Sequence, residues 1–142
     1  INAFDLCHKH GLETIAINII GVPGESEEMI LDTINLNRRL SPTASVVNIF
    51  YPYRGTVLGD KCFKEGLVDE ERFLGFSNER RETILKYSQK HKKMLSHYYD
   101  NWAILMDPYN IKLRLIKFLQ TIGVGEFARR IKRRLFPPLT TK

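Results

Sequence analysis

The chain has 142 residues, of which 43% are hydrophobic and 27% charged, and its formal net charge is +6. This length suits one domain with a single modest core. Two cysteines exclude a disulfide framework, and the lack of an apolar run of about 18 residues excludes a membrane-spanning helix. The composition therefore predicts a cytoplasmic protein.

The first residues predict the last turns of a helix that is already under way. Phe4 and Cys7 share a helical face, and Gly11 follows as a stop signal. Cys7, His8 and His10 crowd one turn, but a structural zinc site needs four ligands and no second cluster supplies them. We therefore expect no metal site here.

Residues 15–20, with the sequence IAINII, predict a β-strand that runs into a glycine-rich loop. The run is apolar on both faces, which is typical of a strand covered on both sides in a parallel α/β sheet. Gly21 and Gly24 permit backbone angles that side chains disfavour, Pro23 stiffens the loop between them, and Ser26 can cap the next helix. Ligands sit at the carboxyl ends of such strands. This is therefore a candidate ligand-binding loop, with an ordinary tight turn as the alternative.

A second strand is predicted one helix later. Residues 27–40 carry apolar side chains at the spacing of an amphipathic helix, which Ser41 and Pro42 end. Residues 44–50, ASVVNIF, are again rich in β-branched residues and lead into the loop YPYRGT at residues 51–56. A strand, a helix and a strand in this order form a crossover unit, so both loops are expected at the same edge of the sheet.

The following part of the chain is predicted to be mostly helical. Residues 60–66 predict a short helix with a glycine stop, and residues 69–73 a polar connection. A long helix is expected at about residues 78–105 and another at 111–122, separated by Pro108. One face of the long helix is expected to be buried, namely Ile84, Ser88, His91, Leu95, Tyr98, Trp102 and Leu105. The aromatic residues Tyr98, Tyr99 and Trp102 are expected in the core, with the lining of a substrate cavity as the alternative.

Basic charge is concentrated near the carboxyl terminus. Residues 1–106 hold 13 Lys or Arg against 14 Asp or Glu, whereas residues 107–142 hold 9 against 2. Residues 124–135 predict a basic amphipathic helix. Docking of its apolar stripe on the rest of the chain is the favoured interpretation, and contact with an anionic membrane surface or with a phosphate backbone are the alternatives. Two prolines end this helix, and residues 137–142 are expected to be disordered.

Together, the two loop motifs resemble a known family. The sequence IIGVPGES, followed by a helix with DTINLNRRLSP and then by NIFYPYRGTVLGDKCFKEGLV, resembles the carboxyl half of the radical S-adenosylmethionine barrel. The closest resemblance is to the subgroup that often carries an amino-terminal cobalamin-binding domain. It covers roughly residues 1–68. It implies an α/β fold, the carboxyl-terminal portion of a partial TIM-like (β/α) barrel, followed by a mostly α-helical extension.

The resemblance also implies which residues meet the cofactor. In the family, the fifth barrel strand ends in an Ile-x-Gly-x-x-Glu-like motif against the adenine of S-adenosylmethionine; the present loop has one extra residue before the Glu. The sixth strand and its loop approach the adenosyl group and the substrate. The expected cofactor-binding residues are Ile19, Ile20, Gly21, Pro23, Gly24, Glu25, Asn48, Phe50 and Tyr51. The expected substrate-side loop consists of Tyr53, Arg54, Gly55 and Thr56, and Arg54 stands where relatives commonly have proline.

The cysteine count limits what this chain does alone. The family's chemistry needs a Cys-x-x-x-Cys-x-x-Cys motif, because three thiolates hold a 4Fe-4S cluster whose open iron binds S-adenosylmethionine. Cys7 and Cys62 are too few and too far apart for that motif. The resemblance therefore implies the carboxyl-terminal fragment of a longer enzyme, inactive by itself, with the cluster ligands and any cobalamin site outside this chain. The implied partners are a small-molecule substrate and an electron donor for the intact enzyme, with nucleic acid disfavoured.

This interpretation divides the chain into a barrel part at residues 1–68, a helical extension or cap at residues 69–136, and a tail at residues 137–142. It predicts that the chain supplies the adenine-side wall of a cofactor pocket and part of a substrate cap. The alternative is a noncatalytic α/β module in which the same two loops hold a nucleotide-like ligand. In either case Glu25 is expected to be a structural cap or a ligand contact rather than a general acid or base.

Overall fold

The computed structural model describes residues 1–75 and 81–121. The predicted basic helix at residues 124–135 and the predicted tail at residues 137–142 lie outside the described residues. The described residues form a mixed α/β fold with six helices and one two-stranded parallel sheet. The chain divides into two compact units, Ile1–Trp102 and Ala103–Lys142. The first unit thus runs across the boundary that the sequence suggested at residue 68.

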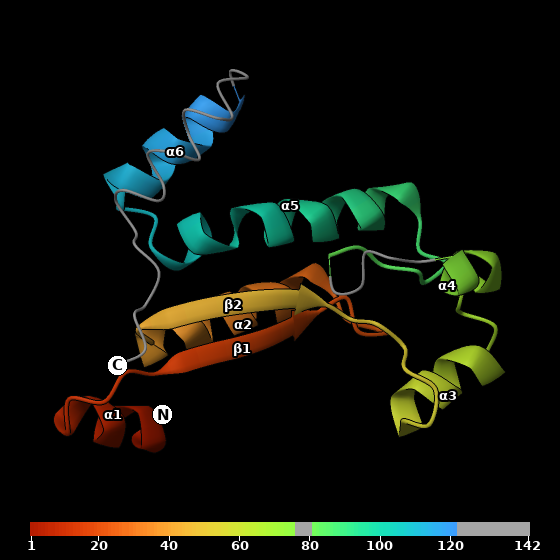
Figure 1. The fold of residues 1–142 in the computed structure, drawn as a ribbon, viewed down its shortest axis with the longest axis horizontal. Coiled ribbons are helices and arrows are strands. Elements are labelled where there is room, and N and C mark those ends of the chain that lie inside the picture. Colours follow the sequence, from red (N-terminus) through yellow and green to blue (C-terminus); the bar gives the residue numbers. More distant parts are fainter. Residues whose placement is uncertain (76–80, 122–142) are drawn as a thin grey trace. The chain divides into compact units, whose positions relative to one another are not determined.

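A strand, helix and strand form the centre of the first unit (Figure 1). After α1 (Asn2–Lys9) come β1 (Ile15–Ile20), α2 (Glu27–Leu40) and β2 (Ala44–Ile49). The strands pair in parallel, with Ile15 opposite Ala44 and Ile20 opposite Ile49. The predicted crossover is confirmed, and the loops after β1 and β2 leave the sheet at the same edge.

Local signals explain why α2 begins and ends where it does. The Ser26 hydroxyl accepts a hydrogen bond from the Met29 amide at 3.3 Å, as predicted for an N-cap. At the other end Ser41 adopts a left-handed conformation with φ 46° and donates its amide to the Asn37 carbonyl at 3.0 Å. Between these caps, the buried side chains of α2 are Ile30, Ile34 and Asn37.

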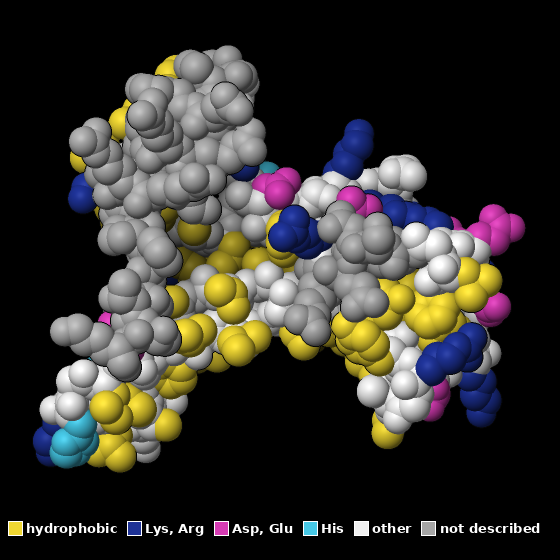
Figure 2. Space-filling model, viewed as in Figure 1, with side chains coloured by type: hydrophobic (Ala, Val, Ile, Leu, Met, Phe, Trp, Pro, Cys, Tyr) yellow, Lys and Arg dark blue, Asp and Glu magenta, His cyan; other side chains and the backbone are white. Residues whose placement is uncertain are grey.

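The described residues cover only one face of the sheet, which corrects the expectation of a strand buried on both sides. Ala16, Ile20, Val47 and Ile49 are buried on the face toward the helices. The residues between them point the other way, because side chains alternate along a strand. Ile15, Ile17, Ile19 and Val46 are accordingly exposed, and Figure 2 shows hydrophobic side chains over this part of the molecule. The described residues supply helices to one face alone, and they form two strands rather than a barrel.

A polar network lies between the sheet and its helices. The Asn18 and Asn37 side-chain amides exchange hydrogen bonds at 3.2 and 2.7 Å. Ser45 donates to the Asn37 side-chain oxygen at 3.0 Å and accepts from the Trp102 indole N–H at 2.9 Å. These hydrogen bonds join β1, α2 and β2 to the later helix α5 (Gln89–Met106). The two side-chain amides pair with each other, so neither is left buried without a hydrogen-bond partner.

The segment after β2 begins its helix earlier than predicted. Helix α3 spans Val57–Lys64 rather than residues 60–66, because the Thr56 hydroxyl accepts from the Gly59 amide at 3.1 Å and caps it. Helix α4, Glu70–Gly75, occupies the segment that was predicted to be a polar connection. There the Asp69 carboxylate accepts from the Arg72 amide at 3.1 Å, a helix cap that the sequence DEER contained.

The long helix is shorter than predicted. It begins at Gln89, and residues 81–88 are not helical, so the expectation of a helix from residue 78 is wrong there. Leu85 instead forms an antiparallel bridge with Val68, and Ile84 and Leu85 are both buried beside Tyr51 and Cys62. The tertiary bridge to Val68, rather than the helical spacing of the apolar residues, therefore decides the backbone conformation here.

The remaining helices follow the prediction closely. Leu95, Tyr98 and Trp102 of α5 are buried, which confirms three members of the expected face. Helix α6 spans Ile111–Thr121 after the break at Pro108. Among the described residues, no helix combines the length and the apolar character needed to cross a bilayer.

Candidate functional site

The loop after β1 is fixed by its own glutamate. Gly21 and Gly24 have φ values of +79° and +84°, a region that favours glycine. The Glu25 carboxylate accepts a hydrogen bond from the Gly21 amide, and the Glu25 amide donates to the Val22 carbonyl at 2.9 Å. The loop is therefore a closed turn.

Helix α5 and the residues before it hold this loop from one side. The Tyr87 hydroxyl donates to the Gly21 carbonyl at 3.2 Å, and burial raises the pKa of Tyr87 to about 12, so the hydroxyl keeps its proton. A Cβ on Gly21 would lie 2.9 Å from the Leu95 side chain. The lack of a side chain at Gly21 thus lets α5 pack closely on the loop. The side of Gly21 where a Cβ would lie faces the helix rather than solvent.

The loop after β2 is a second closed turn. The Thr56 hydroxyl donates to the Tyr53 carbonyl at 2.7 Å. The Gly55 amide, at φ +82°, donates to the Asp60 carboxylate at 2.9 Å. Both loops are joined at the sheet edge, because the Phe50 amide donates to the Ile20 carbonyl at 2.8 Å.

Aromatic rings hold Arg54 of the loop after β2. Its guanidinium carbon lies 3.6 Å from the centre of the Phe63 ring and 5.7 Å from that of Phe73. Such cation–π contacts are attractive by roughly 0.5–1 kcal/mol at exposed sites. Phe63 and Phe73 also pack edge to face at 5.0 Å. The Arg54 side chain thus anchors the loop to these two rings.

A hollow of about 360 Å³ lies between the carboxyl ends of the two strands. Its lining combines apolar and aromatic side chains with one amide, from Ile19, Asn48, Ile49, Phe50, Tyr51, Tyr53 and Thr56. The Asn48 side-chain amide makes no hydrogen bond to another described residue. This is a largely apolar hollow whose polar groups are one amide and the hydroxyls of Tyr51, Tyr53 and Thr56, the usual character of a small-molecule site.

The structure distributes the predicted site residues over two sides of the sheet. Six of them line the hollow: Ile19, Asn48, Phe50, Tyr51, Tyr53 and Thr56. Ile20 is buried in the core, and Gly21, Pro23, Gly24 and Glu25 form the loop that contacts the α5 side. Arg54 and Gly55 belong to the second loop without lining the hollow. The sequence did not single out Ile49, which lines it, or Phe63 and Phe73, which anchor Arg54.

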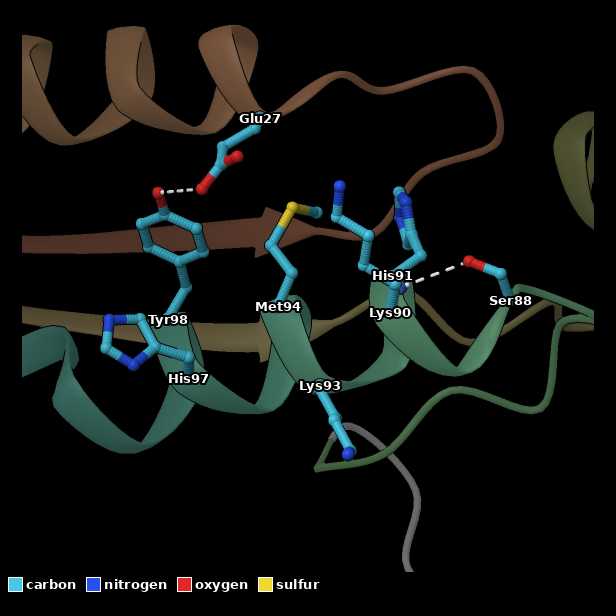
Figure 3. A pocket seen from close by; sticks show the side chains of 8 residues that line it. All are labelled: Glu27, Ser88, Lys90, His91, Lys93, Met94, His97 and Tyr98. Atoms are coloured by element: carbon cyan, nitrogen blue, oxygen red, sulfur yellow. Dashed lines mark hydrogen bonds between the residues drawn. The ribbon is translucent and has the colours of Figure 1, made fainter.

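A second hollow, of about 580 Å³, lies between the start of α2 and α5 (Figure 3). The Tyr98 hydroxyl donates to the Glu27 carboxylate across it at 2.8 Å. Lys90 and His91 point toward the loop before α2, whereas Lys93 points away. The His91 Nε2 atom is buried and has no hydrogen-bond partner among the described residues. Cationic and anionic groups thus share this hollow, and its chemistry favours no single class of ligand.

Burial controls the ionisation of Glu25. Desolvation raises the pKa of its carboxyl above the usual 4.5, although the Gly21 and Val22 amides and the nearby His91 lower it in part. A raised pKa means that the folded chain binds this proton more tightly than the unfolded chain. Glu25 therefore contributes stability below pH 4.5, and this contribution is lost as pH rises through the raised pKa.

We expect Glu25→Gln to gain stability relative to the wild type as pH rises. The neutral side-chain amide can still accept the hydrogen bond from the Gly21 amide. It carries no charge, so it does not lose stability through desolvation of a half-buried carboxylate. The melting temperatures of both proteins, measured from about pH 4 to about pH 7, check this expectation. Glu28→Gln, at an exposed position of α2, is the control. A Glu25→Gln difference that stays constant across this range would contradict the argument.

No metal-binding cluster of His, Cys, Asp or Glu occurs in the part of the chain that the structure describes. His8 instead contacts the Thr14 hydroxyl through its Nε2 atom at 3.3 Å. Cys62 is buried, and burial raises the pKa of its thiol, which keeps it protonated and weakens it as a metal ligand.

Comparison of the chain with models of known families, with curated proteins and with solved structures found no match.

Proposed function

We propose that this chain forms the adenine-side wall of an S-adenosylmethionine pocket in a radical S-adenosylmethionine enzyme, within a (β/α) barrel that its two strands help to build. The observation that carries the proposal is the hollow at the joined carboxyl ends of β1 and β2. The helical residues after residue 68 are proposed to form part of the substrate cap.

The lining of the hollow fits a purine. An adenine ring has flat apolar faces and a polar edge, so it needs apolar or aromatic contacts and a few hydrogen-bonding groups. Ile19 and Phe50 supply the first requirement and the Asn48 amide, which can both donate and accept, supplies the second. The bare face of the sheet, which continues from Ile19 to Ile17 and Ile15, is consistent with a wall that further strands would complete.

The cluster is not part of this chain's contribution. A 4Fe-4S cluster of this family needs three thiolates, and the chain has two cysteines, one of them buried. When bound, S-adenosylmethionine supplies a sulfonium group whose reductive cleavage starts radical chemistry. This chain alone is therefore expected to yield no 5′-deoxyadenosine with dithionite. Cluster ligands, any cobalamin site and the docking of an electron donor are assigned to other parts of the enzyme.

Adenosine and S-adenosylmethionine should bind at Ile19 and Asn48. In two-dimensional NMR spectra of the 142-residue chain, both ligands are expected to shift the amide signals of β1 and β2 near their carboxyl ends. Ile19→Asn should weaken this binding by about tenfold, which corresponds to ~1.4 kcal/mol of lost apolar contact.

Ile15→Asn is the matched control, since Ile15 lies on the same strand and face and is 56% exposed against 54% for Ile19. It should leave the affinity unchanged. Absence of shifts with both ligands, or equal weakening by the two substitutions, would overturn the assignment of this hollow. The enzyme assignment has its own test, because a Cys-x-x-x-Cys-x-x-Cys motif must occur in the same open reading frame or in a partner subunit.

One observation favours a second candidate function. The lining of the hollow contains no carboxylate, imidazole or thiol, so the described residues around it offer no acid, base or nucleophile other than hydroxyl groups. A noncatalytic module that holds a nucleotide-like ligand needs none. Binding of adenosine at Ile19 without any cluster motif in the gene or its partners would favour this module over the enzyme.

A further inference from the structure

Helix α6 carries large apolar side chains on two different faces. Ile116 is buried, whereas Ile111, Leu115 and Phe118 are exposed, Ile111 at 79% and Phe118 at 59%. The spacings of four and three residues place this exposed trio on one stripe of the helix. No described residue covers this stripe, and an exposed apolar patch of this kind often marks an interaction site.

Cationic side chains border the bare stripe. At about 100° per residue, Lys112 and Arg114 fall on opposite flanks of the stripe formed by Ile111, Leu115 and Phe118. Neither forms an ion pair with a described residue. No acidic residue occurs from Pro108 to Thr121. The helix therefore presents apolar side chains between two cations without a compensating carboxylate of its own.

We propose that α6 lies on the surface of anionic lipid bilayers, with Ile111, Leu115 and Phe118 in the acyl boundary and Lys112 and Arg114 at the headgroups. Long basic side chains can keep their charge in the polar layer while their stems cover apolar surface. An apolar stripe with flanking cations is the arrangement that such interfacial helices use. Tyr109, which is exposed just before the helix, would lie at the same level as the headgroups.

The apolar stripe of α6 is distinct from the basic helix predicted at residues 124–135. For that later segment, which lies outside the described residues, contact with an anionic membrane surface was one alternative interpretation of the sequence. The present proposal assigns the contact to α6, and it does not depend on the proposed S-adenosylmethionine site. The experiment has to separate the two segments.

Sedimentation of the 142-residue chain with vesicles tests the proposal. We expect binding to vesicles of equal parts phosphatidylglycerol and phosphatidylcholine, and much weaker binding to phosphatidylcholine alone. The triple variant Ile111→Asn, Leu115→Asn, Phe118→Asn should lose more than about a hundredfold in partition coefficient. The double variant Lys112→Gln, Arg114→Gln should lose roughly thirtyfold, which is about 2 kcal/mol, on anionic vesicles only.

The matched control is Val57→Asn with Leu74→Asn, which removes exposed apolar side chains from the first compact unit. It should bind vesicles as the wild type does. Far-UV circular dichroism reports whether the triple variant keeps its helices. If it does not, the charge variant decides, since it replaces only exposed side chains.

Several results would overturn the proposal. One is full vesicle binding by the triple variant. Another is binding that survives both α6 variants and disappears on Arg129→Gln, Arg130→Gln and Arg133→Gln, which would assign the contact to the later segment. A dimer in light scattering that the triple variant converts to a monomer, with vesicle binding unchanged, would assign the stripe to a second copy. Binding of duplex RNA in place of vesicles, weakened by the charge variant, would assign the cations to a phosphate backbone.

Discussion

Replacing Gly59 by alanine is expected to lower the free energy of unfolding by about 3 kcal/mol and to open the loop after β2. A Cβ at this position would overlap the carbonyl oxygen of Tyr53 and lie 2.7 Å from the Thr56 hydroxyl oxygen. The obstacle is backbone, which cannot rotate away as a side chain can. The change would also disturb the two hydrogen bonds of Thr56 that close the turn and cap α3.

Urea unfolding of Gly59→Ala measures this cost from the midpoint and slope. Gly75→Ala is the control, because Gly75 is the last residue of α4 and an added Cβ there meets no atom within 4 Å. Alanine favours helix over glycine by about 1 kcal/mol, so the control should be neutral or slightly more stable. Equal midpoints for the two variants would show that the loop adapts to the methyl group.

Leu95→Ala is expected to cost about 3 kcal/mol, within the usual range for a fully buried leucine. Leu95 has no exposed surface, and its side chain is the nearest neighbour of the position a Gly21 Cβ would take. Removing it leaves a cavity between α5 and the loop after β1. Leu31→Ala, at an exposed position of α2, should cost much less and serves as the control.

A double-mutant cycle sharpens this expectation. Gly21→Ala in the wild type bears both left-handed backbone strain, about 1–2 kcal/mol, and a clash with Leu95. In the Leu95→Ala background the clash is gone, so the cost should fall to that of Gly24→Ala, which has a similar φ and nothing within 4 Å of an added Cβ. A cost of Gly21→Ala that is the same in both backgrounds would refute close packing of Leu95 on Gly21.

Local sequence signals were sufficient for the central crossover unit. The apolar runs of β1 and β2, the cap at Ser26 and the stop at Ser41 each have a short-range cause, and the structure contains all of them. The same reasoning failed at residues 81–88. Ile84, Ser88 and His91 have helical spacing, but Ile84 and Leu85 are held by a bridge to Val68, a tertiary contact without a local signal.

The candidate site was predictable only in part for a similar reason. Both faces of β1 carry apolar residues, with Asn18 as the exception. Hydrophobicity alone could therefore not show which face of the strand is exposed. Ile19 and Ile20 were both assigned to one pocket, although consecutive residues of a strand point to opposite faces. The two rings that contact Arg54, Phe63 and Phe73, belong to α3 and α4. Their contact with Arg54 depends on how these helices pack against the loop after β2, which has no local signal in the sequence.

The polar network of Asn18, Asn37, Ser45 and Trp102 has a consequence for synthesis on the ribosome. Trp102 follows Ser45 by 57 residues, so the β1–α2–β2 unit is made well before the helix that completes its hydrogen bonds. At 5–20 residues per second, this gap lasts roughly 3 to 11 s. During that interval α2 already packs on the sheet, but the part of the same face that α5 covers stays open, so we expect the nascent unit to be more prone to aggregation until α5 emerges.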